Sequence, residues 1–326
     1  MTMKAAIRTQ YGPPEILQLK EVVRPLPDTQ QVLVKIHAGS VNRTDCHNLN
    51  ATPFFMRLVL GLFRPKKPIP GTSFAGEVVE MGTTISSYKP GDRVFGFDDE
   101  VASAHAEYLT ITEDKLASIP DNVGYAEAAV SPEGAHYALN FINKVDLQRG
   151  DNVLVYGASG AIGSAAVQLL KHLGVEVTAV CSGRHVDVVK SLGADRVVDY
   201  SKEDFTKDTQ RYRFVMDAVG KISFFKCKKL LQPGGVFASS DLGFLAQNLY
   251  LPMLAPLLKR LFGNRYTIFP MPVDIKASLL LLQKLMAVGD FKPLIDREYP
   301  LEEIIAAYQY VEQGRKTGNV VITVGN

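Results

Sequence analysis

The chain has 326 residues, about the length of two average domains, and 46% of them are hydrophobic and 21% charged. Lysine and arginine outnumber aspartate and glutamate only by 36 to 34, and the absence of a dense basic run argues against a nucleic-acid-binding protein. The three cysteines are far apart, the N-terminus lacks a signal-peptide pattern, and no apolar run is long enough to span a membrane. These features predict a cytoplasmic enzyme without an integral membrane segment.

The first third of the chain is predicted to be rich in β-strands. Short apolar runs at 32–36, 76–81 and 93–97 are separated by proline and glycine, and the turn at 89–92 leads into a strand. Evenly spaced short strands with turn signals are typical of a small barrel or sandwich.

The pattern changes near residue 121, where apolar runs of strand length begin to alternate with segments of helix length. The expected helices include 162–173 and 185–192, and the expected strands are 152–156, 175–180, 197–200, 214–217, 235–239 and 266–269. This alternation predicts a doubly wound, six-stranded parallel sheet with helices on both faces, as in a Rossmann fold. A last strand at 319–324 is expected to rejoin the β-rich part.

A motif of small residues follows the first strand of this sheet. Ala158, Gly160 and Gly163 have the spacing of G-x-G-x-x-G, with alanine in the first slot. Such residues let the backbone approach a pyrophosphate, whose charge is stabilised at a helix N-terminus near the amides of Ala161 and Ile162. A tight turn with no ligand is the competing interpretation.

The end of the second strand indicates which dinucleotide is bound. Proteins that bind NAD usually carry an acidic residue there, and this strand ends in Val180-Cys181-Ser182-Gly183-Arg184, without one. Ser182 and Arg184 suit a 2′-phosphate, and Tyr200 is expected over the same pocket, which favours NADPH. Arg184 as a solvated residue of the first helical turn is the alternative.

Short motifs occur in a characteristic order along almost the whole chain. Besides the glycine motif they lie at 3–6, 38–45, 70–78, 91–94, 191–195, 217–220 and 233–235. Together they resemble the medium-chain dehydrogenase/reductase superfamily, and most closely its zinc-free quinone oxidoreductase (ζ-crystallin-like) branch. The resemblance implies a GroES-like catalytic domain of residues 1–122 and 288–326, and a Rossmann NADP-binding domain of residues 123–287. It also implies a homodimer that pairs around 266–269.

The positions that match the zinc ligands of alcohol dehydrogenases carry other residues. Asn42 stands in place of the first cysteine, Thr72 and Ser73 replace the His-Glu pair, and no cysteine occurs at 131–133. Amide and hydroxyl groups make a poor zinc site. Cys46 and His47 lie close together but come after the ligand position, so we expect no metal.

The same resemblance suggests catalytic groups. It places Asn42 at the nicotinamide ribose or the substrate, and it matches Thr44 and His47 to a proton relay. A turn-stabilising role for Asn42, and an exposed His47 without a role, are the alternatives. Asp45 is expected to be a buried hydrogen-bonding partner of the local backbone.

Further residues are assigned from the resemblance and from strand ends. His136 matches a position near the nicotinamide, and Ala218 and Val219 should border its ribose because ligands of open α/β sheets bind at the carboxyl ends of strands. Ser131, with proline after it, is predicted to be the N-cap of a helix.

Two unusually apolar segments, 53–63 and 244–262, are expected to form the substrate pocket through Phe54, Phe55 and Leu254, together with His136. Core or dimer packing is one alternative. Contact with a membrane surface is another, because cations flank both segments: Arg57, Arg64, Lys66, Lys67, Lys259 and Arg260.

These observations predict a zinc-independent, NADPH-dependent oxidoreductase that transfers hydride to a small apolar quinone or α,β-unsaturated carbonyl. Charge that moves onto a distant oxygen of such an acceptor needs only hydrogen-bond donors for stabilisation. Whether quinones accept one electron or two is left open. The alternatives are a zinc-independent alcohol or aldehyde dehydrogenase, and an NADPH-binding sensor or structural protein with little turnover.

Overall fold

The computed structural model describes residues 1–100, 102–243, 246–258, 260–270 and 272–325. The chain forms two compact units, one made of Met1–Glu133 with Asp274–Asn326 and the other of Gly134–Val273. We call them the first and the second unit. The expected boundaries at 122/123 and 287/288 concern domains that fold separately, which these compact units do not define, so they stay a prediction.

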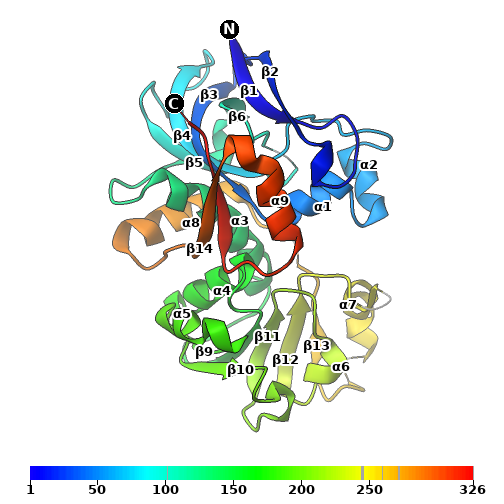
Figure 1. The fold of residues 1–326 in the computed structure, drawn as a ribbon. Coiled ribbons are helices and arrows are strands. Elements are labelled where there is room, and N and C mark those ends of the chain that lie inside the picture. Colours follow the sequence, from blue (N-terminus) through cyan, green and yellow to red (C-terminus); the bar gives the residue numbers. More distant parts are fainter. Residues whose placement is uncertain (101, 244–245, 259, 271, 326) are drawn as a thin grey trace. The chain divides into compact units, whose positions relative to one another are not determined.

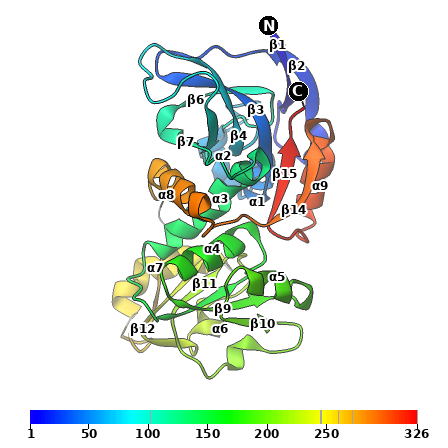
Figure 2. The same cartoon turned by 90° about the vertical axis from the view of Figure 1, so that its left-hand side faces the viewer.

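The first unit is built on a seven-stranded sheet in which the last strand of the chain takes an inner position (Figures 1 and 2). The strand order is β14-β15-β3-β4-β5-β7, and β6 also pairs with β3. β15 runs antiparallel to β3 and parallel to β14, so the prediction that residues 319–324 rejoin the β-rich part is confirmed. The strands are β3 (Gln31–Val41), β4 (Ser73–Met81), β5 (Arg93–Phe97), β6 (Tyr108–Thr112), β7 (Leu116–Ser118), β14 (Ile295–Pro300) and β15 (Asn319–Thr323); β1 (Thr2–Ile7) and β2 (Gln18–Val23) form a separate hairpin.

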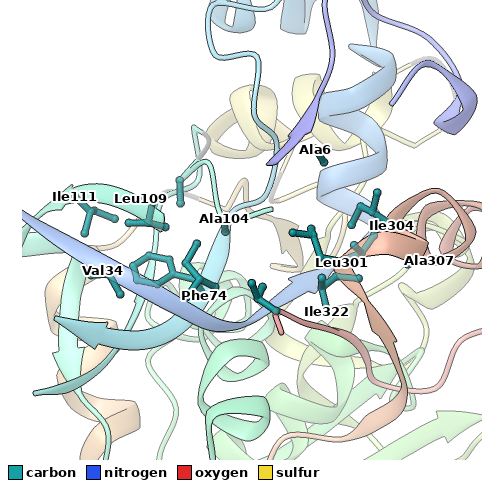
Figure 3. Close-up of a cluster of buried hydrophobic side chains, with 14 of the residues drawn as sticks. Ala6, Val34, Phe74, Ala104, Leu109, Ile111, Leu301, Ile304, Ala307 and Ile322 are labelled. Atoms are coloured by element: carbon teal, nitrogen blue, oxygen red, sulfur yellow. The ribbon is translucent and has the colours of Figure 1, made fainter. Parts of the chain in front are cut away.

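The core of the first unit joins residues from both ends of the chain (Figure 3). Val34 of β3 and Phe74 of β4 belong to the same buried cluster as Ile304 and Ala307 of α9 and Ile322 of β15. The helices of this unit are α1 (Arg43–Asn50), α2 (Arg57–Leu60), α8 (Ile275–Val288) and α9 (Ile304–Glu312), and α3 (Tyr125–Ile142) begins in it. Burial of this cluster attaches the C-terminal segment to the N-terminal strands.

The second unit contains the predicted six-stranded parallel sheet, in the order β10-β9-β8-β11-β12-β13. This is the order of a Rossmann fold, which reverses between the first and the fourth strand and opens a crevice there. The strands are β8 (Asn152–Tyr156), β9 (Glu176–Cys181), β10 (Arg196–Asp199), β11 (Tyr212–Asp217), β12 (Leu231–Ser239) and β13 (Tyr266–Thr267). The helices are α4 (Ala161–His172), α5 (Val186–Ser191), α6 (Phe224–Cys227) and α7 (Gln247–Leu258).

Short 3₁₀ turns connect many of these elements. They lie at Pro14–Ile16, Phe54–Met56, Glu113–Lys115, Gly183–His185, Phe205–Lys207 and Leu301–Glu303. No helix among the described residues combines the length and the apolar character that a membrane crossing requires.

Candidate functional site

Asn42 lies between β3 and α1 and begins that helix. Its backbone is extended, with φ of −128°, and its backbone N–H donates to Oδ2 of Asp45 at 2.8 Å. A carboxylate three residues after an N-cap satisfies a backbone donor that the helix leaves open. Asp45 is 1% exposed, as expected for a buried partner of the local backbone.

The side chain of Asn42 is held on both sides. Its Nδ2 donates to Oε2 of Glu133 at 2.9 Å and to Oδ1 of Asn319 at 3.1 Å, and its Oδ1 accepts from Nζ of Lys316 at 2.7 Å. Both amide hydrogens are therefore used, and the side chain also takes part in the capping box of α1 with Asp45.

Glu133 comes from the middle of α3. The prediction that Ser131 caps this helix is wrong, because α3 already begins at Tyr125, in a stretch dominated by alanine and glutamate. Pro132 is accommodated inside the helix, and the Ser131 hydroxyl donates to the carbonyl of Glu127 at 2.7 Å. Glu133 thereby lies on a rigid element.

Two hydroxyls complete the surroundings of the Glu133 carboxyl. The side chains of Thr44 and Thr72 form hydrogen bonds with it, and the Thr72 hydroxyl also donates to Oδ1 of Asp45 at 3.3 Å. Of the two relay residues expected from the sequence, Thr44 therefore joins this polar cluster. His47 is exposed, on the following turn of α1.

The charges of the cluster are strongly perturbed by burial. Burial raises the pKa of Glu133, and burial together with repulsion from Glu133 raises the pKa of Asp45 well above its usual range. Burial lowers the pKa of Lys316 to about 8, against the opposing attraction of Glu133. The neutral forms of all three groups are thus easily reached.

This cluster does not fit zinc. Asn42 and Thr72, which match zinc-ligand positions by resemblance, meet here with Glu133 from the region 131–133, and hydrogen bonds join them through Glu133. The ammonium group of Lys316 donates to the Asn42 oxygen and would repel a divalent cation. Among the described residues, no three His, Cys, Asp or Glu side chains gather in a way that suits a metal ion.

The glycine motif of the second unit forms a tight turn between β8 and α4. Gly157, with φ of +80°, makes this turn in place of Ala158, because only glycine adopts positive φ without strain. The backbone N–H groups of Gly157 and Ala158 both donate to the carbonyl of Val180. Sequence reasoning missed Gly157, although it directly precedes the motif.

The N-terminus of α4 is suited to an anion. The helix begins at Ala161 after Gly160, and its first turn contains no acidic residue. The amides of Ala161, Ile162 and Gly163 have no acceptor inside the helix and carry the positive end of its dipole. A Cβ on Gly160 would have only the Gly157 carbonyl nearby, at 3.6 Å, so the surface of the turn is open. These features fit a dinucleotide pyrophosphate.

The end of β9 carries the residues expected to select the cofactor. Arg184 and Tyr200 are exposed, and the Ser182 hydroxyl lies 3.1 Å from Nδ1 of His185. An acid that was not anticipated lies beside them: Asp199, at the end of the neighbouring strand β10, accepts a hydrogen bond from the backbone of Gly183. Asp199 lies at the end of the third strand of the sheet. The sequence prediction used only the residues at the end of the second strand and therefore did not include it.

The loop after β11 is fixed by a buried carboxylate. Asp217 accepts from the backbone N–H groups of Val219, Gly220 and Ile222 at 3.1, 2.9 and 3.0 Å, and from the hydroxyl of Ser239. Val219 is thereby held against Gly157, whose added Cβ would lie 2.6 Å from the valine side chain. The role expected for Ala218 and Val219 beside the nicotinamide ribose stays a prediction. His136 is buried, 5.9 Å from the ring of Tyr137.

Each unit carries one of the two apolar segments. In the first unit, Phe54 (71% exposed), Phe55, Leu58 and Phe63 lie at the surface around α2. In the second unit, Leu254 (41% exposed) lies on α7, together with other exposed side chains: Leu249, Tyr250, Met253 and Leu257. Leu60 and Leu251 are buried, so core packing accounts for only a part of either segment. Residues 244, 245 and 259 of the second segment lie outside the described residues.

Comparison with known proteins agrees with this architecture. Residues 28–140 match the family model of the alcohol dehydrogenase GroES-like domain, and residues 192–322 match that of zinc-binding dehydrogenase. The 2-methylene-furan-3-one reductase of Solanum lycopersicum is 32% identical over 337 residues, which cover 98% of this chain and 79% of that protein. The chloroplastic NADPH-dependent alkenal/one oxidoreductase of Arabidopsis thaliana is 28% identical over 336 residues, with the same two coverages.

A solved structure extends the likeness to the fold. The quinone oxidoreductase from Coxiella burnetii superposes with a TM-score of 0.86 at 27% identity, and the match covers 100% of both chains. This chain therefore shares its fold with that protein along its whole length. The chain belongs to the medium-chain dehydrogenase/reductase superfamily.

Proposed function

We propose that this protein is a zinc-independent, NADPH-dependent reductase of quinones and α,β-unsaturated carbonyl compounds. The observation that carries the proposal is the hydrogen-bonded cluster of Asn42, Glu133 and Lys316, in which Asn42 stands where the resemblance expects a zinc ligand. A conjugated acceptor delocalises the developing charge and so needs no Lewis acid at its oxygen. The names of the relatives, which include an enone reductase and a quinone oxidoreductase, support the same class of acceptor.

NADPH would be held by the second unit. The turn of Gly157 and Gly160 and the N-terminus of α4 suit its pyrophosphate, and Ser182 and Arg184 suit its 2′-phosphate. When bound, NADPH supplies the hydride. The residues of this chain would orient the cofactor and the acceptor, exclude water and provide the proton.

The preference for NADPH over NADH has a structural counterargument. Three carboxylates line one pocket beside Gly183 and would repel a 2′-phosphate unless Arg184 and Lys202, which also lines this pocket 3.8 Å from Asp199, outweigh them; the three are Asp187, Asp199 and Glu203. Replacing Arg184 with Ala should therefore lower the affinity for NADPH by about tenfold or more and leave that for NADH nearly unchanged. Equal losses for both cofactors would show that Arg184 acts only through the fold.

NADPH oxidation by protein dialysed against EDTA tests the whole proposal. The panel contains quinones, short and long enones and saturated aldehydes, with NADH as a control. Turnover of quinones or enones that survives EDTA and favours NADPH is the expected result. Activity that is confined to saturated carbonyls, or that is lost with the metal, would contradict it.

The proposal extends to the oligomeric state of the protein and to its cellular compartment. We propose a homodimer that pairs along β13, which is the edge strand of its sheet and offers unpaired backbone groups. We also propose a reducing compartment such as the cytoplasm, since Cys46, Cys181 and Cys227 are all buried free thiols. Light scattering of the purified protein checks the dimer.

A further inference from the structure

A short segment around α2 presents a group of large apolar side chains to solvent, and Figure 1 draws α2 at the right-hand side of the first unit. Leu58 and Phe63 are the most exposed of them, at 73% and 86%. Single exposed apolar side chains are common on proteins, whereas a contiguous group marks a contact surface. We call this group the apolar surface; it consists of Phe54, Phe55, Leu58, Val59, Leu62 and Phe63.

The backbone beneath the apolar surface is fixed. Leu60 is buried, and its carbonyl accepts from the backbone N–H of Lys66 at 2.8 Å. The Tyr11 hydroxyl donates to the carbonyl of Gly61 at 2.7 Å. Gly61 has φ of +122°, and an added Cβ would collide with the carbonyl oxygen of Arg64, so this turn requires glycine. The fold therefore holds the apolar side chains outward in a defined arrangement.

Positive charge accompanies the apolar surface. The chain has no aspartate or glutamate from residue 46 to residue 76, and this stretch contains four cations: Arg57, Arg64, Lys66 and Lys67. Lys67 lies 3.6 Å from Asp98 of a neighbouring strand. Among the residues that the structure describes, no acidic side chain forms an ion pair with Arg64 or Lys66, and both are exposed. These two cations therefore give the edge of the apolar surface a net positive charge.

An anionic bilayer matches both features. Protein surfaces that lie in a membrane interface combine apolar side chains, which enter the acyl region, with cations that meet the headgroups. A second copy of this chain fits less well, because a two-fold contact through this surface would bring Arg64 and Lys66 of both copies together. We propose that the apolar surface docks on bilayers that contain anionic lipids, with Leu58, Leu62 and Phe63 inserted.

This docking goes beyond the proposed function, because it concerns where the protein acts and not which acceptor it reduces. Apolar quinones and long enones partition into bilayers, so a docked protein lies where such acceptors collect. Phe54 and Phe55, at the start of the segment, are also expected to contact the acceptor. The docking test therefore uses residues from the other end of the apolar surface.

Sedimentation with lipid vesicles tests the docking. The wild type should bind vesicles of equal parts phosphatidylcholine and phosphatidylglycerol, and should bind phosphatidylcholine alone about tenfold more weakly or less. Binding to the anionic vesicles should weaken as the salt concentration rises, because salt screens the attraction between the cations and the headgroups. A wild type that does not bind the anionic vesicles overturns the proposal.

Two double variants measure the apolar and the electrostatic contributions. Leu58→Ser combined with Phe63→Ser should weaken binding to anionic vesicles by about tenfold or more, because two side chains no longer enter the acyl region. Arg64→Gln combined with Lys66→Gln should weaken it by a similar factor, about tenfold, because two cations no longer meet the headgroups.

Each double variant has a matched control in the first unit. Val23→Ser combined with Leu26→Ser changes two other exposed apolar side chains, and Lys20→Gln combined with Lys89→Gln removes the same charge from other exposed positions. Both controls should bind within about threefold of the wild type. Equal affinity in all four double variants and the wild type would place the contact outside the apolar surface and overturn the proposal.

Tryptophan fluorescence tests the insertion at a single position. The chain contains no tryptophan, so an introduced one is the only source of indole emission. Phe63→Trp keeps an aromatic side chain, and its emission should shift to the blue with anionic vesicles and be quenched by lipids with brominated acyl chains. Val23→Trp should show neither change. A protein that binds vesicles while the emission of Phe63→Trp stays unchanged contacts the bilayer elsewhere, which overturns the proposal.

The remaining outcomes are separated by light scattering and by turnover. A wild type that ignores vesicles, and whose mass falls when Leu58→Ser and Phe63→Ser are introduced, uses this surface between copies of the chain, which overturns the docking. Vesicle binding needs no turnover, so a wild type that reduces neither quinones nor enones overturns the proposed function alone.

Discussion

A Cβ atom on Gly163 would collide with the carbonyl oxygen of Gly157 and lie 2.8 Å from Cα of Ala158, whereas a Cβ on Gly160 would meet only that carbonyl oxygen, at 3.6 Å. The two glycines of one motif therefore serve different ends. Gly163 lets α4 pack against the turn, and Gly160 leaves the turn open to a ligand.

This difference predicts opposite phenotypes for two identical substitutions. Gly163→Ala should destabilise the fold, by about 1–3 kcal/mol, because backbone atoms have to shift. Gly160→Ala should leave the free energy of unfolding within about 1 kcal/mol and weaken NADPH binding, since the methyl group obstructs the pyrophosphate. Urea unfolding and fluorescence titration with NADPH measure the two effects. Equal NADPH affinity in Gly160→Ala and the wild type would show that the pyrophosphate does not bind at this turn.

The buried lysine predicts an alkaline stability signature. Lys316 has a pKa of about 8 in the folded chain and 10.5 as its ordinary value, so between these pH values the unfolded chain binds more protons. Stability from this group therefore rises with pH across that window, by at most about 1.4 kcal/mol per pH unit. Lys316→Met should lose this slope in urea unfolding curves, and Lys292→Met, at an exposed position, should keep it. The same slope in both variants would show that Lys316 is not desolvated.

The buried imidazole of His105 predicts a loss of stability in acid. Burial lowers its pKa to about 4, from an ordinary value of 6.5, although Nε2 donates to the carbonyl of Ser40 at 2.8 Å. Between these pH values the unfolded chain takes up a proton that the folded chain refuses, so stability falls as the pH falls. The loss is at most about 3 kcal/mol. His105→Gln should flatten this part of the pH dependence, measured by urea unfolding, and the exposed His172→Gln should not.

The exposed apolar segments predict a dependence on the length of the acceptor. We propose that long acceptors contact these side chains, so Phe54→Ser and Leu254→Ser, tested one at a time, should each raise KM for long-chain enones by about fivefold or more and alter KM for short enones little. Val23→Ser, at another exposed apolar position, is the control. Steady-state kinetics with a homologous series of enones gives the comparison. Equal effects along the series would exclude these two residues from the substrate pocket.

The second unit was predictable from sequence because its signals are local. Each strand is an apolar run, each helix has its own periodicity, and the glycine turn lies next to the strand that it follows. The predicted strand at 152–156 coincides with β8. The strand expected at 266–269 includes only Tyr266–Thr267, since an edge strand with one neighbour has no second partner to extend its pairing.

The polar cluster was predictable only in part. The sequence indicates roles for Asn42 and Thr44, but it predicts Glu133 only as part of a helix cap and contains no local signal for Lys316 or Asn319. Their contacts with Asn42 join residues 274 and 277 positions apart in the chain. No local pattern encodes such a contact, because it depends on how β15 enters the sheet beside β3.

The inner position of β15 also determines the order in which parts of the nascent chain can complete their folding. The segment Gly134–Val273 is continuous, so it is synthesised completely before translation reaches the last part of the first unit, Asp274–Asn326. The strands β3 to β7, made first, lack Ile322 in their core and Lys316 in the polar cluster until synthesis has passed β15. Before that point Lys316 is not yet beside Glu133 and Asp45, so the polar cluster of the first unit is completed only when its last strand is made, whereas the whole second unit has already been synthesised.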